Sequence, residues 1–226
     1  MRFAAVLFDM DGVILDSMAC HAQAWQEVLA GLGVRVPLSF ILENEGALGA
    51  EVLWRFLDEH GPALELPPLD RQQAQAGMAR LLDQQAALYL ERQAGSVRPF
   101  PGVRRMLRGL KRAGVPAALV TSSRREMVET CLPPEIRQGF AVVVCAEDVT
   151  RHKPHPAPYL TAAGRLAQAP QDCLVVENAP AGIAAAAAAG ATCYALASTL
   201  TPAHLAQAQA VFPDLERLAC HLGLLD

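Results

Sequence analysis

The fold is decided by a stretch that passes from apolar to acidic within a few residues, AAVLFDMDG at residues 4–12. Its apolar part shows no alternation, which is typical of a strand buried on both faces of a parallel sheet. Asp9 and Asp11 follow at once and point to the same side of an extended chain. Two buried carboxylates a few ångströms apart need a cation, a shared proton or solvent nearby. The alternative is a simple Asp-Gly turn capped by Asp9.

Similar apolar runs recur downstream and alternate with helical patterns. The runs occupy residues 116–120, 141–145, 173–176 and, more weakly, 192–196; the helical patterns occupy residues 103–113, 124–132, 158–167 and 181–189. This alternation predicts an α/β fold, a Rossmann-like parallel sheet with right-handed crossovers. In such sheets ligands bind at the carboxyl ends of the strands.

Residues 17–95 interrupt the alternation. They contain no convincing strand and are rich in Leu, Ala, Gln and Glu, with apolar residues at helical spacing. We expect an inserted α-helical domain at residues 17–96, with residues 1–16 and 97–226 forming the catalytic core. Residues 13–17 and 95–101 are the candidate joints, the latter rich in Gly and Pro.

Composition narrows the class of protein. The chain has 226 residues, of which 52% are hydrophobic and 19% charged, and this composition indicates a globular protein. Its net charge of −4 gives no reason to expect nucleic acid or an anionic membrane as partner. The six cysteines form no CxxC pair, so free thiols are expected rather than a zinc site. The first apolar run is too short for a signal peptide, and no segment predicts a membrane span. We therefore expect a cytoplasmic protein.

Polar residues follow the later strands as well. Thr121 and Ser122 end the second apolar run, where a hydroxyl and backbone amides could hold a phosphate or simply cap a helix. Lys153 is one of only two lysines among 19 basic residues, and it lies among prolines. It is either a required point charge or a solvated surface residue.

Glu177 and Asn178 follow the fourth apolar run. Oxygen ligands there, opposite Asp9 and Asp11, would suit Mg²⁺. Asn178 is also a candidate helix cap, and the two roles are compatible.

These residues, in this order, resemble the four motifs of the haloacid dehalogenase superfamily: Asp9-x-Asp11, Thr121, Lys153 and Glu177-Asn178. The insertion resembles the small helical cap of its β-phosphoglucomutase and phosphoglycolate phosphatase branch. The resemblance spans nearly the whole chain.

The resemblance implies a mechanism. Asp9 would be the nucleophile that forms an aspartyl-phosphate, and Asp11 the general acid and base. Mg²⁺ would be held by Asp9, Asp11, Glu177 and Asn178, while Thr121, Ser122 and Lys153 would hold phosphoryl oxygens. The implied substrate is a small phosphorylated metabolite, and the oligomeric state is open.

Two departures from the family pattern leave alternatives open. Asn178 stands where the family usually has Asp, so a catalytically weak phosphometabolite-binding protein is one alternative. Gly49 stands where the mutase carries an arginine for a distal phosphate, which favours a phosphatase over a sugar-phosphate mutase, although Arg55 could substitute. The predicted function is Mg²⁺-dependent hydrolysis of a small phosphomonoester.

Three residues of the insertion are candidates for the substrate pocket. His21 and Trp25 lie four apart and share one helix face, with Trp25 expected in the core and His21 facing either the cleft or the core. Glu45 is a candidate pocket residue or a helix-terminal surface residue.

Overall fold

The strands expected from the sequence form one parallel sheet. The computed structural model describes residues 2–31, 33–44, 71–92 and 95–224, without the side chains of residues 71–79. The sheet has six strands in the order β5-β4-β1-β6-β7-β8, and every neighbouring pair is parallel. The α/β prediction is confirmed. The strands are β1 (Ala5–Phe8), β4 (Ala117–Val120), β5 (Val142–Val144), β6 (Cys173–Glu177), β7 (Thr192–Leu196) and β8 (Ala210–Phe212).

Strand β1 is buried on both faces, as its continuous apolar sequence predicts. Ala5 and Leu7 contribute to the core on one side of the sheet, and Val6 and Phe8 to the core on the other. All four side chains are fully buried. Because β1 is central, whatever follows it is held at the middle of the sheet's carboxyl edge.

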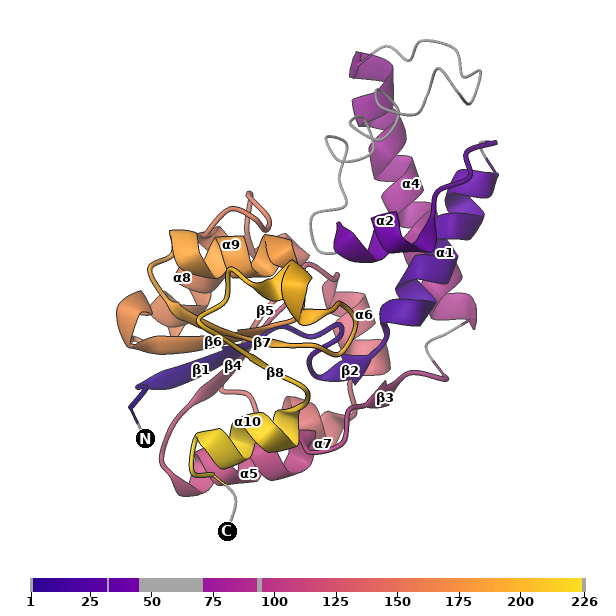
Figure 1. Ribbon diagram of the computed structural model, residues 1–226. Helices are drawn as coiled ribbons and strands as arrows, with labels where there is room; N and C mark the ends of the chain where they lie inside the picture. Colours follow the sequence, from indigo (N-terminus) through magenta and orange to yellow (C-terminus); the bar gives the residue numbers. More distant parts are fainter. Residues whose placement is uncertain (1, 32, 45–70, 93–94, 225–226) are drawn as a thin grey trace.

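Helices cover both faces of the sheet (Figure 1). One face carries α8 (Ala157–Arg165) and α9 (Pro180–Ala188), and the other carries α5 (Val103–Arg112) and α10 (Leu215–His221). The shorter α6 (Arg125–Cys131) and α7 (Pro134–Arg137) follow β4. In α5 the buried apolar residues recur every three or four positions, so one stripe faces the core and the arginines face out.

The elements that the sequence did not predict are short. β8 has three half-buried residues, and α10 has seven residues whose first turn is capped by the Asp214 carboxylate, which accepts from the Arg217 amide at 2.8 Å. Neither is long enough for an apolar period to emerge.

The insertion contributes a separate group of helices, α1 (Met18–Ala30), α2 (Leu38–Glu43) and α4 (Arg71–Arg92), called here the insertion helices. Figure 1 shows them standing together to one side of the sheet. They have their own apolar cluster, in which Trp25 packs with Leu29, Ile41 and Leu81. Trp25 is 4% exposed, which agrees with its expected place in a core.

The two candidate joints run side by side. β2 (Leu15–Asp16) pairs antiparallel with β3 (Arg98–Pro99), and the Phe100 amide donates to the Ile14 carbonyl at 2.9 Å. The chain thus leaves and re-enters the sheet region through one short ribbon. Division into a core and a cap domain at residues 17 and 96 stays a prediction.

Within the described residues, none of the helices is both long and apolar enough to span a membrane.

Candidate active site

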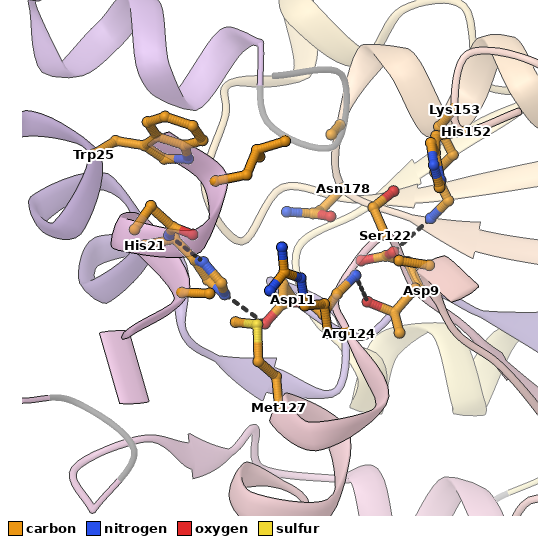
Figure 2. Close-up of a pocket in the computed structure, with 18 of the residues that line it drawn as sticks. Asp9, Asp11, His21, Trp25, Ser122, Arg124, Met127, His152, Lys153 and Asn178 are labelled. Atoms are coloured by element: carbon orange, nitrogen blue, oxygen red, sulfur yellow. Dashed lines mark hydrogen bonds and ion pairs between the residues drawn. The ribbon is translucent and has the colours of Figure 1, made fainter. Parts of the chain in front are cut away.

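A pocket of about 380 Å³ opens at the carboxyl ends of the strands, between the sheet and the insertion helices (Figure 2). The structure brings together in its lining most of the residues singled out from the sequence: Asp9, Asp11, His21, Thr121, Ser122, Lys153, Glu177 and Asn178. Trp25 also reaches the lining, so it serves the core and the pocket at once. Glu45, Gly49 and Arg55 lie outside the described residues.

Asp9 lies at the end of β1 and shares a buried ammonium with Glu177. Lys153 Nζ donates to Asp9 Oδ1, to Glu177 Oε1 at 2.7 Å and to the Val120 carbonyl at 3.2 Å. The Lys153 side chain is 2% exposed, so the surface alternative for this lysine is excluded. Its three protons all have acceptors, and its direction is fixed by them.

The charge around Asp9 is unbalanced. Asp9, Asp11 and Glu177 are all buried, and Lys153 is the cation that faces Asp9. Burial raises the pKa of the Asp9 carboxyl to about 8 despite the charge of Lys153, and the negative charges of Glu177 and Asp11 act in the same direction as burial. An additional cation in this pocket would therefore be stabilised.

Asp11 has different neighbours. Ser17 Oγ donates to its Oδ1 at 2.6 Å, His21 Nε2 lies 3.1 Å from the same oxygen, and Ser123 Oγ donates to Oδ2 at 2.7 Å. Burial alone would raise the pKa of Asp11, but the charge of His21 and the hydrogen bonds from His21, Ser17 and Ser123 outweigh it and lower the pKa to about 2. In this arrangement Asp11 is ionised at neutral pH and can accept a proton.

His21 is held in place by helix α4 of the insertion. Gln85 Nε2 lies 3.2 Å from His21 Nδ1, and the ring of Tyr89 stacks on the imidazole with 4.1 Å between the centroids. In the neutral ring the Gln85 amide can donate to Nδ1, and the proton of the imidazole is then on Nε2 and faces Asp11. In the charged ring, which lowers the pKa of Asp11, both nitrogens carry protons and Nε2 still donates to Asp11. His21 thus faces the cleft, and it contacts Asp11 rather than open space.

The hydroxyl-rich turn after β4 is stabilised by a hydrogen bond within it. The Ser123 amide donates to Thr121 Oγ1 at 2.9 Å, so Thr121 caps the turn, while both residues line the pocket. Ser122 lies between them in the same lining. The cap and the phosphate-binding alternatives for Thr121 are therefore compatible.

Glycine allows Asn178 and Glu177 to approach the turn after β1 and the start of α9. A Cβ on Gly12 would lie 2.0 Å from Asn178 Nδ2, and the φ of Gly12 is +84°, a conformation that favours glycine. A Cβ on Gly182 would lie 1.7 Å from Glu177 Oε1. Both side chains are thus packed against backbone that a larger residue would block.

Several residues at the site were not among the predicted ones, and those that contact the predicted residues include Ser17, Gln85, Ser123 and Tyr159. Ser17 and Ser123 neighbour predicted residues in the sequence. Tyr159 donates to Glu177 Oε1 at 2.6 Å, and burial together with the Glu177 charge raises its pKa well above the ordinary value. Gln85 is 64 positions from His21, and no local pattern indicates the contact.

The donors present fit Mg²⁺ modestly. Among the described residues, no three His, Cys, Asp or Glu side chains are grouped so that they could hold a metal ion. Mg²⁺ needs few carboxylates, however, because it keeps several waters and binds substrate phosphate. The Asp9 carboxylate, the Asp11 carbonyl and the Asn178 carboxamide are hard oxygen donors, and the raised pKa of Asp9 means that a further cation would favour its ionised form.

A parallel sheet with an acid-rich pocket at its carboxyl edge places the molecule in the Rossmann-like α/β class of enzymes. Comparison with known proteins narrows this class. The family model of the haloacid dehalogenase-like hydrolases matches residues 3–190. The chain belongs to the haloacid dehalogenase-like hydrolase family, and its relatives identify it as a phosphohydrolase.

Individual relatives agree. The chain is 33% identical to the fructose-1-phosphate phosphatase YqaB of Escherichia coli, over 84% of this chain and 94% of that protein. A hydrolase from Pseudomonas syringae has a similar structure, with a TM-score of 0.84, 25% identity, and coverage of 97% of this chain and 98% of that one. A Deinococcus radiodurans hydrolase of the family, solved with bound phosphate and sodium, has a TM-score of 0.70 and 29% identity, covering 99% and 98% of the two chains.

Proposed function

We propose that this protein is a Mg²⁺-dependent phosphatase that hydrolyses a small phosphomonoester through an aspartyl-phosphate on Asp9. The observation that carries the proposal is the convergence of Asp9, Asp11 and Lys153 in one pocket, although Lys153 is 144 positions from Asp9 in the chain. A carboxylate, an acid or base and an ammonium are the groups that such a transfer requires.

In the first step an Asp9 oxygen attacks phosphorus, and the ester P–O bond breaks. Thr121 and Ser122, which line the pocket around Asp9, hold the phosphoryl oxygens, and the Lys153 ammonium beside Asp9 offsets their negative charge. Mg²⁺, when bound, would offset the negative charge of the phosphate and of Asp9. The leaving oxygen takes a proton from Asp11, which must first be protonated and exchange its bonds to Ser17 and His21 for one to that oxygen.

In the second step water attacks the aspartyl-phosphate. Asp11, ionised in the arrangement described above, accepts the proton of that water, so that phosphate leaves and Asp9 is regenerated.

The pocket supports a small substrate. Its wall on the side of the insertion combines Trp25 and Leu82 with the polar groups of His21 and Gln85. Apolar faces with a few convergent polar groups suit a compact phosphorylated metabolite such as a sugar phosphate. The relative named as a fructose-1-phosphate phosphatase supports the same class. A cytoplasmic location is part of this proposal, since such metabolites are found there.

The test measures inorganic phosphate released from a panel of sugar, polyol and carboxylate monophosphates, with and without Mg²⁺. Wild type is compared with Asp9→Asn and with Asp172→Asn, which alters an exposed carboxylate just before β6, at the far end of that strand from Glu177. We expect Mg²⁺-dependent release that is lost only in Asp9→Asn.

Two other outcomes would redirect the proposal. Isomerisation of a sugar phosphate that requires a bisphosphate activator, without free phosphate, would identify a mutase. Binding of phosphorylated compounds without either reaction would identify a weak or silent binding protein. Release of phosphate by Asn178→Asp would then assign the loss of activity to Asn178.

A further inference from the structure

The hydroxyl of Tyr159 reaches the charged cluster at Asp9 from outside the pocket. Tyr159 belongs to α8, is 1% exposed, and is not among the residues that line the cavity. A substrate in the pocket therefore does not touch it. Any effect of Tyr159 on a reaction there must pass through the residues it contacts.

Tyr159 contacts both members of the Lys153–Glu177 ion pair. Its hydroxyl donates to Glu177 Oε1 at 2.6 Å, and its ring lies below Lys153 Nζ, which is 5.1 Å from the ring centroid. Lys153 Nζ donates to the same Glu177 oxygen at 2.7 Å. One oxygen thus receives two donors, and the ammonium is held between a carboxylate and an aromatic face.

The Glu177 carboxylate is fully used by these contacts. Its second oxygen accepts the backbone amides of Asn178 at 2.9 Å and Ala179 at 3.3 Å. A carboxylate offers about four acceptor positions, and Glu177 has four donors. The close approach to Gly182 also prevents the carboxylate from turning toward α9. In this arrangement Glu177 has no acceptor position left for a cation.

The position of Glu177 determines that of Lys153. The ammonium has three acceptors, of which Glu177 and Asp9 are charged. If Glu177 moved away, the ammonium would lose one of the two carboxylates between which it is held, and its direction toward Asp9 would be less well fixed.

We infer that Tyr159 is a positioning residue, whose hydroxyl keeps the Glu177 carboxylate hydrogen-bonded to Lys153. This contact holds the Lys153 ammonium against Asp9, and it keeps Glu177 from binding Mg²⁺. The inference rests on the proposed function, because it assigns a role within that same site. It departs from the sequence-based expectation that Glu177 is a metal ligand.

The test is Tyr159→Phe, with Tyr194→Phe as the matched control. Tyr159→Phe keeps the ring and its packing, and Tyr194 lies on β7 among Phe3, Phe212 and His221, outside the pocket lining. For Tyr159→Phe we expect kcat to fall about tenfold, because one hydrogen bond to a charged group is lost, with a smaller change in KM. The control should match wild type.

The second readout is the dissociation constant of Mg²⁺, measured by calorimetry on the substrate-free proteins. Tyr159→Phe frees an acceptor position on a buried carboxylate, so we expect Mg²⁺ to bind several-fold more tightly than to wild type. A residue that only packs would leave this constant unchanged, and thermal unfolding of all three proteins reports any loss of packing.

The outcomes separate the two proposals. Two results for Tyr159→Phe would overturn the role of Tyr159: kcat and Mg²⁺ affinity that both match wild type, or Mg²⁺ binding that is weaker than in wild type. The phosphatase proposal would stand in either case if Asp9→Asn is inactive. If wild type released no phosphate from any compound, the phosphatase proposal would fail, and tighter Mg²⁺ binding by Tyr159→Phe would still support its control of Glu177.

Discussion

Asp9 and Asp11 are separated by one residue, yet their surroundings come from different regions of the molecule. Asp9 is held from the core of the sheet, by Lys153 beside Glu177. Asp11 is held by Ser17 and His21, which lie at the start of the insertion, and by one residue of the β4 turn, Ser123. The pKa of Asp9 is raised to about 8 and that of Asp11 is lowered to about 2.

Burial does not explain this difference, since both side chains are buried to a similar extent. The partners explain it: Asp9 has a second carboxylate beside its ammonium, whereas Asp11 has donors on both of its oxygens. As a consequence, the two carboxylates respond differently to movement of the insertion helices. A movement of α1 or α4 would change the hydrogen bonds of Asp11, whereas the bond from Lys153 to Asp9 involves no residue of the insertion helices.

The largest effect on activity is expected from substitution of Asp9. Asp9→Asn removes the proposed nucleophile, so phosphate release should fall to background, a loss of at least about 10³-fold. Asp11→Asn removes proton transfer but keeps the nucleophile, and should cost about 10²- to 10⁴-fold. Single-turnover experiments with a substrate that has a good leaving group should show an aspartyl-phosphate in Asp11→Asn alone. Its appearance in Asp9→Asn would contradict the assignment.

A large effect is also expected from Lys153→Met, which keeps the stem and removes the charge. Loss of one preorganised donor should lower kcat about 10²- to 10³-fold. Because the variant leaves Asp9 and Glu177 without their cation, it should also be less stable by about 3 kcal/mol, measured by urea unfolding. Lys111→Met is the control, since Lys111 is the other lysine and is exposed on α5. Equal effects of the two substitutions would refute the role of Lys153.

An intermediate effect is expected at Asn178, on the Asp9 side of the pocket. Asn178→Asp adds a charged oxygen donor beside Gly12, and should tighten the apparent Mg²⁺ affinity about tenfold. Asn44→Asp at the end of α2 adds the same charge outside the pocket lining and should change nothing. Calorimetry of both variants decides, and unchanged or weaker Mg²⁺ binding by Asn178→Asp would count against a ligand role.

The smallest effect is expected in the pH dependence of stability, which tests the contacts of Asp11. Because the pKa of Asp11 is about 2 in the folded protein and 3.8 in its unperturbed state, its ionised form stabilises the fold above about pH 4, and this stabilisation is lost as pH falls toward 2. His21→Ala removes part of the pKa shift of Asp11 and should lower the unfolding free energy relative to wild type. This loss should be about 1 kcal/mol smaller at pH 2.5 than at pH 5.

The control for this prediction is His221→Ala on α10, which lies outside the pocket lining. Its difference from wild type should not follow the titration of Asp11. Urea unfolding at several pH values measures both variants, and a difference for His21→Ala that is constant with pH would show that His21 does not lower the pKa of Asp11.

The sequence by itself predicted the sheet and the residues that meet at its carboxyl edge. Continuous apolar runs predicted β1, β4, β5, β6 and β7, because a strand buried on both faces can carry no alternation. Asp9, Thr121 and Glu177 could be placed at one edge because parallel strands end on the same side. These are local properties of the chain combined with one rule of topology.

Only the tertiary structure decided which groups touch. Gln85 on His21 and Tyr159 on Glu177 join residues of different elements, and side-chain partners of this kind follow from packing rather than from any local period. The same is true of the two carboxylates: their spacing of one residue indicated a shared site, but their opposite pKa shifts depend on Lys153, Glu177 and His21. Charge and hydrogen bonding act through space, and the chain order does not record those distances.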